Sequence, residues 1–240
     1  IKETRLASAP LASARDASPP ADARPMEASV GRTHTSDCQS NPRPVFVTDI
    51  TDISRINRIT PPGTIFDNGG VVKSHSYLWI ADGGTVPVYA PADSTLVAGV
   101  YSSDTRTGTV DYGLIFRASC EVEYRFGHFT DPLPHIRAAL SSEPKINDSR
   151  DTQITPIPVK AGELLGYTSG TPVAHNWDFG IYNTTVYPNP LITNDISNVS
   201  EKDKRADCPY DYFTPDKQRL YKNLFQVHIN GSSRAIPYCR

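Results

Sequence analysis

The sequence has no long apolar run, no strong charge bias and only one methionine. Its 240 residues carry a formal net charge of −2, so electrostatics gives no reason to expect nucleic acid or an anionic membrane as partner. No apolar stretch approaches the roughly 20 residues that a membrane-spanning helix needs, so no transmembrane segment is predicted. The sequence also lacks CxxC pairs, phosphate-binding glycine loops and a nucleophile elbow, which argues against zinc ribbons, P-loop proteins and serine hydrolases.

Four widely spaced cysteines are present instead. An even number of dispersed cysteines is typical of exported proteins with disulfides, whereas four buried free thiols would fit a cytosolic protein. We favour disulfides, and three pairings remain open. This predicts a secreted, periplasmic or cell-surface protein, whose signal or anchor we expect to have been removed upstream of Ile1. The cysteines are Cys38, Cys120, Cys208 and Cys239.

Composition divides the chain into three parts. Residues 1–36 are rich in Ala, Ser, Pro and Arg and poor in large apolar side chains, so they are predicted to be a disordered linker. Residues 37–183 read as a β-domain, and residues 184–240 as a C-terminal extension. A helix is predicted near 214–227, with Thr214 as N-cap and Pro215 at the first helical position.

The β-domain is predicted from short apolar and β-branched segments separated by turn residues. Its strands should lie within SHSYLWIA, VPVYAPADSTLVAGVYSS, DYGLIFRA, CEVEYRFGHF, ELLGYTS and HNWDFGIYN. Residues two apart share a face of a strand. In CEVEYRFGHF, this alternation places His128 at the end of the apolar face and Arg125 on the opposite, wet face.

The same alternation gathers polar side chains on two other strands. His75, Tyr77 and Trp79 should point together, and Asn176 and Asp178 should point away from the apolar face of their own strand. A histidine on a strand is often only a hydrogen-bonded structural residue, so periodicity alone predicts no more than a β-rich domain.

The order of these segments resembles the lysostaphin-type (LytM-like) zinc metallopeptidases, which have the duplicated hybrid motif fold. SHSYLWIADGGTVPVYAPADSTLVAGV is similar to the family's opening strand and "GTPVYAPADGTV"-like hairpin. DYGLIFRASCEVEYRFGHFTDPL is similar to the strand pair that ends in "YAHL". VKAGELLGYTSGT and HNWDFGIYN resemble the "VKAGQxIGxxGxTG" turn and the closing "HLHFE" strand. The match spans residues 72–183 and implies a small antiparallel β-sandwich or barrel-like sheet with a groove.

The resemblance implies an incomplete metal site. Family members bind zinc through a histidine, an aspartate four residues later and the second histidine of His-x-His, with two further histidines assisting the water. By position, His75 keeps the first ligand and His128 the "YAHL" histidine, whereas Trp79 replaces the aspartate. Asp178 and Asn176 replace the His-x-His pair. His175 is adjacent, but alternation turns it to the other face unless a bulge intervenes.

Catalytic zinc usually has three protein ligands and a water, so conventional zinc binding is not expected and no cofactor is predicted. We therefore favour a pseudoenzyme, a catalytically degenerate metallopeptidase homologue that binds a cell-envelope glycan, peptide or protein through the former active-site groove near Tyr77 and Trp79. One alternative is a metal-dependent hydrolase with a rebuilt His75, Asp178 and His128 site, in which His128 would be catalytic. The other is a structural or interaction module in which these three side chains form a buried hydrogen-bond network.

Overall fold

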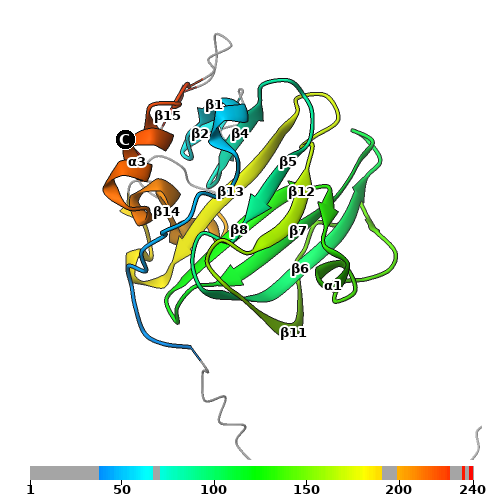
Figure 1. Cartoon of the computed structure of the whole chain (residues 1–240), viewed down its shortest axis with the longest axis horizontal. Coiled ribbons are helices and arrows are strands. Elements are labelled where there is room, and N and C mark those ends of the chain that lie inside the picture. Colours follow the sequence, from blue (N-terminus) through cyan, green and yellow to red (C-terminus); the bar gives the residue numbers. More distant parts are fainter. Residues whose placement is uncertain (1–37, 67–70, 191–198, 228–233, 236–237, 240) are drawn as a thin grey trace, which may run out of the picture. The chain divides into compact units, whose positions relative to one another are not determined.

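The structure is a computed structural model that describes residues 38–66, 71–190, 199–227, 234–235 and 238–239. Its main element is a nine-stranded sheet (Figure 1). All of its pairings are antiparallel except that of β10 with β6. In spatial order its path is β1 (Ile56–Thr60), β4 (Ser76–Ile80), β13 (Asn176–Asn183), β8 (Val122–Phe129), β7 (Thr109–Arg117), β6 (Ser94–Asp104) and β10 (Lys145–Ile146), with β11 (Thr152–Val159) on β6 and β14 (Ala206–Asp207) on β13.

A three-stranded sheet packs across the main sheet, as Figure 1 shows for β5 and β12. Its order is β5 (Val86–Tyr89), β12 (Leu164–Thr168) and β9 (Asp131–Pro132). Val88 and Leu165 of this sheet share one core with Phe116, Phe126 and Phe179 of the main sheet, and all five are fully buried. The mainly β prediction is confirmed as a sandwich, and the described sheets do not close into a barrel.

The remaining elements are short. A small sheet contains β15 (Arg234–Ala235), β2 (Thr64–Phe66) and β3 (Val71–Val72). In the described part of the chain the helices are α1 (Pro134–Arg137) and α3 (Pro215–Lys222), with single 3₁₀ turns at η1 (Ile53–Arg55), η2 (Thr184–Val186), η3 (Asp203–Arg205) and η4 (Pro209–Tyr212). No helix among the described residues has the length and apolar character that crossing a membrane requires.

The C-terminal helix is confirmed as α3, but its details differ from the prediction. Thr214 precedes the helix and Pro215 opens it, yet the Thr214 side chain makes no capping hydrogen bond. Tyr221 is the buried residue of the helix, and its hydroxyl accepts a hydrogen bond from the backbone N–H of Ile50 at 3.0 Å. Helix α3 therefore anchors on the β-core through an aromatic ring and a buried hydrogen bond.

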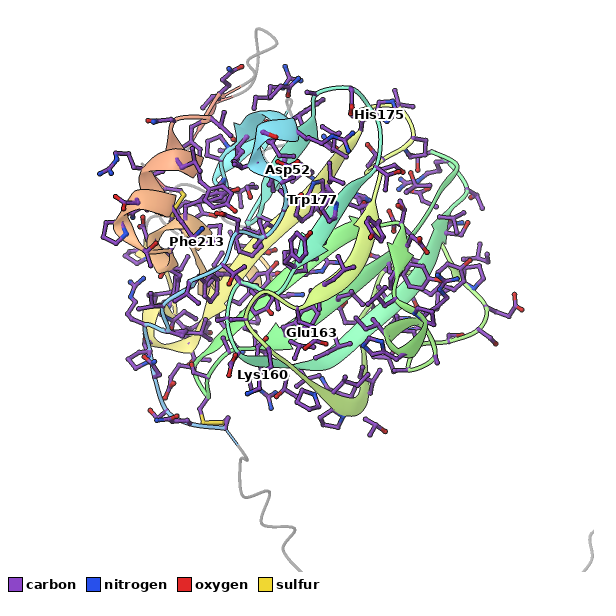
Figure 2. The ribbon with its side chains drawn as sticks, in the orientation of Figure 1. Asp52, Lys160, Glu163, His175, Trp177 and Phe213 are labelled. Atoms are coloured by element: carbon purple, nitrogen blue, oxygen red, sulfur yellow. A yellow bond between two sulfur atoms is a disulfide. The ribbon has the colours of Figure 1, made fainter. Side chains whose placement is uncertain are left out.

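Both pairs of cysteines form disulfides, Cys38 with Cys120 and Cys208 with Cys239. This confirms the prediction of disulfides and indicates an oxidising environment. The first disulfide joins the start of the described chain to the turn before β8. Figure 2 shows the side chains that fill the core and the two yellow sulfur–sulfur bonds. The predicted linker over residues 1–36 lies outside the described residues and stays a prediction.

One strand departs from simple alternation. Leu114 of β7 pairs with Phe126 of β8, whereas Tyr112 pairs with Phe129, so β8 has one extra residue between these pairs. His128 takes up the irregularity with a φ of 54°, in the left-handed region that residues other than glycine seldom adopt. The bulge turns His128 off the apolar face, and Phe129 is buried in its place. The predicted face of His128 was therefore wrong.

Candidate functional site

A pocket of about 720 Å³ lies over the face of the main sheet that does not form the core. Strands β4, β13, β8, β7 and β6 contribute its floor, and the loop Thr171–Ala174 contributes one wall. The structure brings six of the seven sequence-predicted residues to its lining: His75, Tyr77, Trp79, His128, Asn176 and Asp178.

His175 is the one predicted groove residue outside this lining. It precedes β13 with a φ of 51°, and its ring lies beside Gly83, where an added Cβ would be 3.1 Å from the ring atom Cδ2. The bulge that would turn His175 toward Asp178 is not present at this strand. His175 therefore points away from the groove, as strand alternation predicted.

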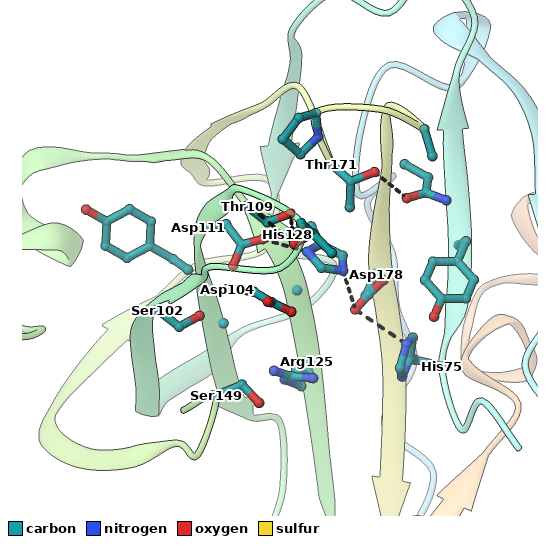
Figure 3. A pocket seen from close by; sticks show the side chains of 18 of the residues that line it. His75, Ser102, Asp104, Thr109, Asp111, Arg125, His128, Ser149, Thr171 and Asp178 are labelled. Carbon is teal, nitrogen blue, oxygen red and sulfur yellow. Dashed lines mark hydrogen bonds and ion pairs between the residues drawn. The ribbon is translucent and has the colours of Figure 1, made fainter. Parts of the chain in front are cut away.

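Asp178 is the centre of the pocket's polar cluster, which Figure 3 shows. Oδ2 of its carboxylate lies 3.4 Å from Nε2 of His75 and 3.8 Å from Nε2 of His128. Strand β13 is hydrogen-bonded on both sides, to β4 and β8, so Asp178 is only 5% exposed. Its other carboxylate oxygen, Oδ1, is enclosed and has no hydrogen-bond partner among the described residues.

Glycine makes room for this cluster. Gly127 stands opposite Asp178 across the β8–β13 pair, and an added Cβ there would lie 2.6 Å from Oδ2 of Asp178. Gly180 stands opposite Arg125, and its added Cβ would lie 2.9 Å from the Cβ of His75. Real Cβ atoms do not approach so closely, so both positions require the absence of a side chain.

His128 is held between two carboxylates. Its Nδ1 is 2.5 Å from Oδ2 of Asp111 on β7, and its Nε2 faces Asp178. Burial lowers the pKa of His128, but Asp178 and Asp111 together outweigh burial, so the net effect is a raised pKa. His128 therefore favours the imidazolium form more than an ordinary histidine does.

His75 has the opposite tendency. Burial lowers its pKa, Asp178 partly opposes this, and the positive charges of Arg125 and Lys73 lower it further. Asp178 itself has a lowered pKa: burial acts to raise it, but the nearby histidines and Arg125 outweigh burial. The cluster thus combines an ionised carboxylate with one neutral and one readily protonated imidazole, a combination suited to binding hydrogen-bond donors and acceptors or to transferring a proton.

Tyr77 and Trp79 line the pocket, but Trp79 is also a structural residue. Its indole Nε1 donates to the hydroxyl of Thr60 at 3.0 Å, and the guanidinium of Arg58 lies 3.8 Å from the ring centroid. The strand β4 therefore uses this position for packing. Burial, and then Asp178, raise the pKa of the Tyr77 hydroxyl, so Tyr77 stays protonated at ordinary pH.

The donor set does not fit a conventional zinc site. Trp79, at the position where the resemblance expects an aspartate, has no atom that binds zinc. Within the described ranges, no group of three or more His, Cys, Asp and Glu side chains is placed to hold a metal ion. His75, His128 and Asp178 converge, but they do not form such a group as they stand.

Sequence reasoning missed four charged residues of the pocket, Arg125, Asp111, Lys73 and Asp104. Arg125 was expected on a wet face, but it lines the pocket on the same face as His128 because the bulge turns the histidine toward it. Asp111, Lys73 and Asp104 were not singled out. Asp111 could have been found from the sequence. If DYGLIFRA and CEVEYRFGHF form a hairpin, pairing their residues outward from the turn places Asp111 beside the end of CEVEYRFGHF, where His128 lies.

In comparisons with known proteins, no family model and no curated protein matches this chain.

Proposed function

We propose that this chain is an exported binding module, related to the lysostaphin-type peptidases but without their zinc chemistry, whose pocket binds a peptide or glycan of the cell envelope. The observation that carries this proposal is Trp79. It lines the pocket where a zinc-binding carboxylate is required, and its Thr60 and Arg58 contacts fix it there. The pocket is retained while the ordinary ligand set is not.

Three features of the pocket support a ligand of this class. Its volume of about 720 Å³ is in the range of clefts that hold small ligands or short peptide segments. Its lining combines the aromatic rings of Tyr77 and Tyr112 with many hydrogen-bonding groups, as sites for sugars and peptides do. Val173, 89% exposed on the pocket wall, adds an apolar contact at the rim.

Sedimentation with purified bacterial cell walls tests this function, with chelator present to exclude zinc-dependent binding. Ser102→Trp should fill the pocket from strand β6, which forms part of its floor, and abolish co-sedimentation. Ser103→Trp is the matched control, because the neighbouring serine does not line the pocket and alternation places it on the other face. Equal binding by both variants, or no binding by the parent protein, would refute the proposal.

A second candidate is a metal-dependent hydrolase that uses His75, His128 and Asp178. The convergence of both Nε2 atoms on one oxygen of Asp178, at 3.4 and 3.8 Å, favours it, since two histidines and one carboxylate are a recurrent ligand set. Metal analysis of protein purified without chelator decides the matter. No bound metal, together with an unchanged melting temperature on adding zinc, would exclude this candidate.

A further inference from the structure

The carboxylates that line the pocket have basic neighbours, whereas the two permanent cations of the lining have no ion-pair partner among the described residues. Each of its three carboxylates lies beside a basic side chain: Asp104 beside Arg106 at 2.9 Å, Asp111 beside His128 at 2.5 Å, and Asp178 beside the neutral His75 at 3.4 Å and His128 at 3.8 Å. The two permanent cations in the lining, Arg125 and Lys73, form no side-chain hydrogen bond or ion pair with any described residue.

Of these two cations, Arg125 gives the clearer evidence of a missing partner. It rises from the middle of β8, and its enclosed Nε has no hydrogen-bond partner in the described part of the chain. Burial lowers its pKa, but Tyr182 and the carboxylates of Asp151 and Asp178 outweigh that effect, so the guanidinium is charged. One of these carboxylates, Asp151, forms an ion pair with Lys202 through Oδ2 at 3.1 Å, and its enclosed Oδ1 has no hydrogen-bond partner among the described residues.

Arg125 lines the pocket, and two positions on the neighbouring strands carry no side chain. Arg125 faces Gly180 on β13, and Gly113 on β7 lies so close that an added Cβ would be 2.9 Å from Nη2. In Figure 3 the guanidinium lies below Asp178 and across from His75, with Ser149 on its other side. Arg125 is half-buried with an enclosed Nε, and an enclosed charged group without a partner is costly, so an anionic group of a ligand would offset that cost.

We propose that this pocket recognises a carboxylate of its ligand, which Arg125 binds through paired hydrogen bonds with Lys73 contributing a second positive charge. The planar guanidinium matches a carboxylate in bidentate geometry, and this accounts for arginine at the floor of the pocket. The inference rests on the proposed function and narrows its ligand: an envelope peptide with a free carboxylate, or a sugar that has one.

Two matched pairs of probes test this on the wild-type protein by titration calorimetry or NMR. Trialanine is compared with trialanine amide, and N-acetylmuramic acid with its lactyl amide, in which only the carboxylate is replaced. In at least one pair, the carboxylate member should bind tenfold or more tightly, and which pair it is identifies the source of the carboxylate. Equal affinity within both pairs, or no binding of any probe, would overturn the inference.

Substitutions test whether Arg125 causes the preference for the carboxylate probe. Arg125→Gln should remove the preference for the carboxylate member, and Lys73→Gln should reduce it. Arg219→Gln, at an exposed position of α3 outside the pocket lining, should leave the preference unchanged. If Arg125→Gln fails to fold by circular dichroism, Arg125→Lys replaces it, with the preference expected to weaken because lysine cannot form the paired bonds.

The two proposals fail separately. Cell walls that sediment equally with wild type and the folded Arg125 variant would refute the carboxylate site and leave the envelope-binding function standing. A preserved carboxylate preference in the Arg125 variant would have the same meaning. Absence of cell-wall binding by the wild type would refute the function itself.

Discussion

The Nδ1 atom of His128 lies 2.5 Å from Oδ2 of Asp111, across the β7–β8 pair. This bond depends on the bulge in β8, which rotates His128 away from the core and toward the pocket. The left-handed backbone at a histidine costs on the order of 1 kcal/mol, and the charge-assisted bond to Asp111 offsets that cost.

Removal of the Asp111 charge should change the titration of His128. Asp111→Asn should lower the pKa of His128, because the carboxylate that stabilises its imidazolium is lost. His75 should respond much less, since Asp111 is not among the groups that shift its pKa. NMR titration of the imidazole protons measures both. An unchanged His128 pKa would contradict the assigned pairing.

The raised pKa of His128 also predicts a pH dependence of stability. A histidine whose folded pKa exceeds its unfolded value stabilises the fold below the unfolded pKa, and this contribution is lost as pH rises through the folded pKa. The melting-temperature difference between wild type and His128→Asn should therefore be larger at about pH 6 than at about pH 9. His75 is present in both proteins, so the larger part of its opposite dependence, which comes from burial, is common to the two. A difference independent of pH would refute this assignment.

Trp79 should contribute to stability through its indole N–H. Trp79→Phe keeps a ring under Arg58 but loses the hydrogen bond to Thr60, so we expect a loss of about 1 kcal/mol in unfolding free energy. In the Trp79→Phe background, Thr60→Val should cost less than it does in the wild type. Urea denaturation of the four proteins measures the coupling, and strictly additive effects would show that the bond contributes nothing.

Gly127 should not tolerate alanine. Its added Cβ would meet Oδ2 of Asp178 at 2.6 Å, and overpacking of this kind typically costs about 1–3 kcal/mol. Gly84→Ala is the matched control, because its added Cβ would meet the ends of two surface side chains, Arg55 at 2.9 Å and Asp82 at 3.2 Å, which can move. Thermal melts compare the two. Equal effects would mean that Asp178 is not held as described.

The regular strands were predictable from the sequence because their core residues alternate. Trp177, Phe179 and Ile181 on β13 are fully buried, which fixed the opposite orientation of Asp178. The strand β11 was not predicted: among the described strands it pairs with β6 alone, and an edge strand with Pro156 and Pro158 gives neither an apolar alternation nor a turn-bounded run.

The pocket was predictable only in part, because a single inserted residue decides it. The bulge after Phe126 follows from how β8 pairs with β7. The residue pattern of one strand does not show which strand it pairs with or in which register. Alternation therefore placed His128 and Arg125 on opposite faces, and the structure places both on the pocket. Disulfide pairing was open for the same reason, since it depends on which segments meet in space.

Titration of solubilised cell-wall fragments into chelator-treated protein tests the central claim most directly, with zinc added in a second series. We predict binding without zinc, no change in affinity on adding it and no cleavage of the fragments, with Ser102→Trp abolishing the signal. Binding that requires zinc and is followed by hydrolysis of the fragments would contradict the account.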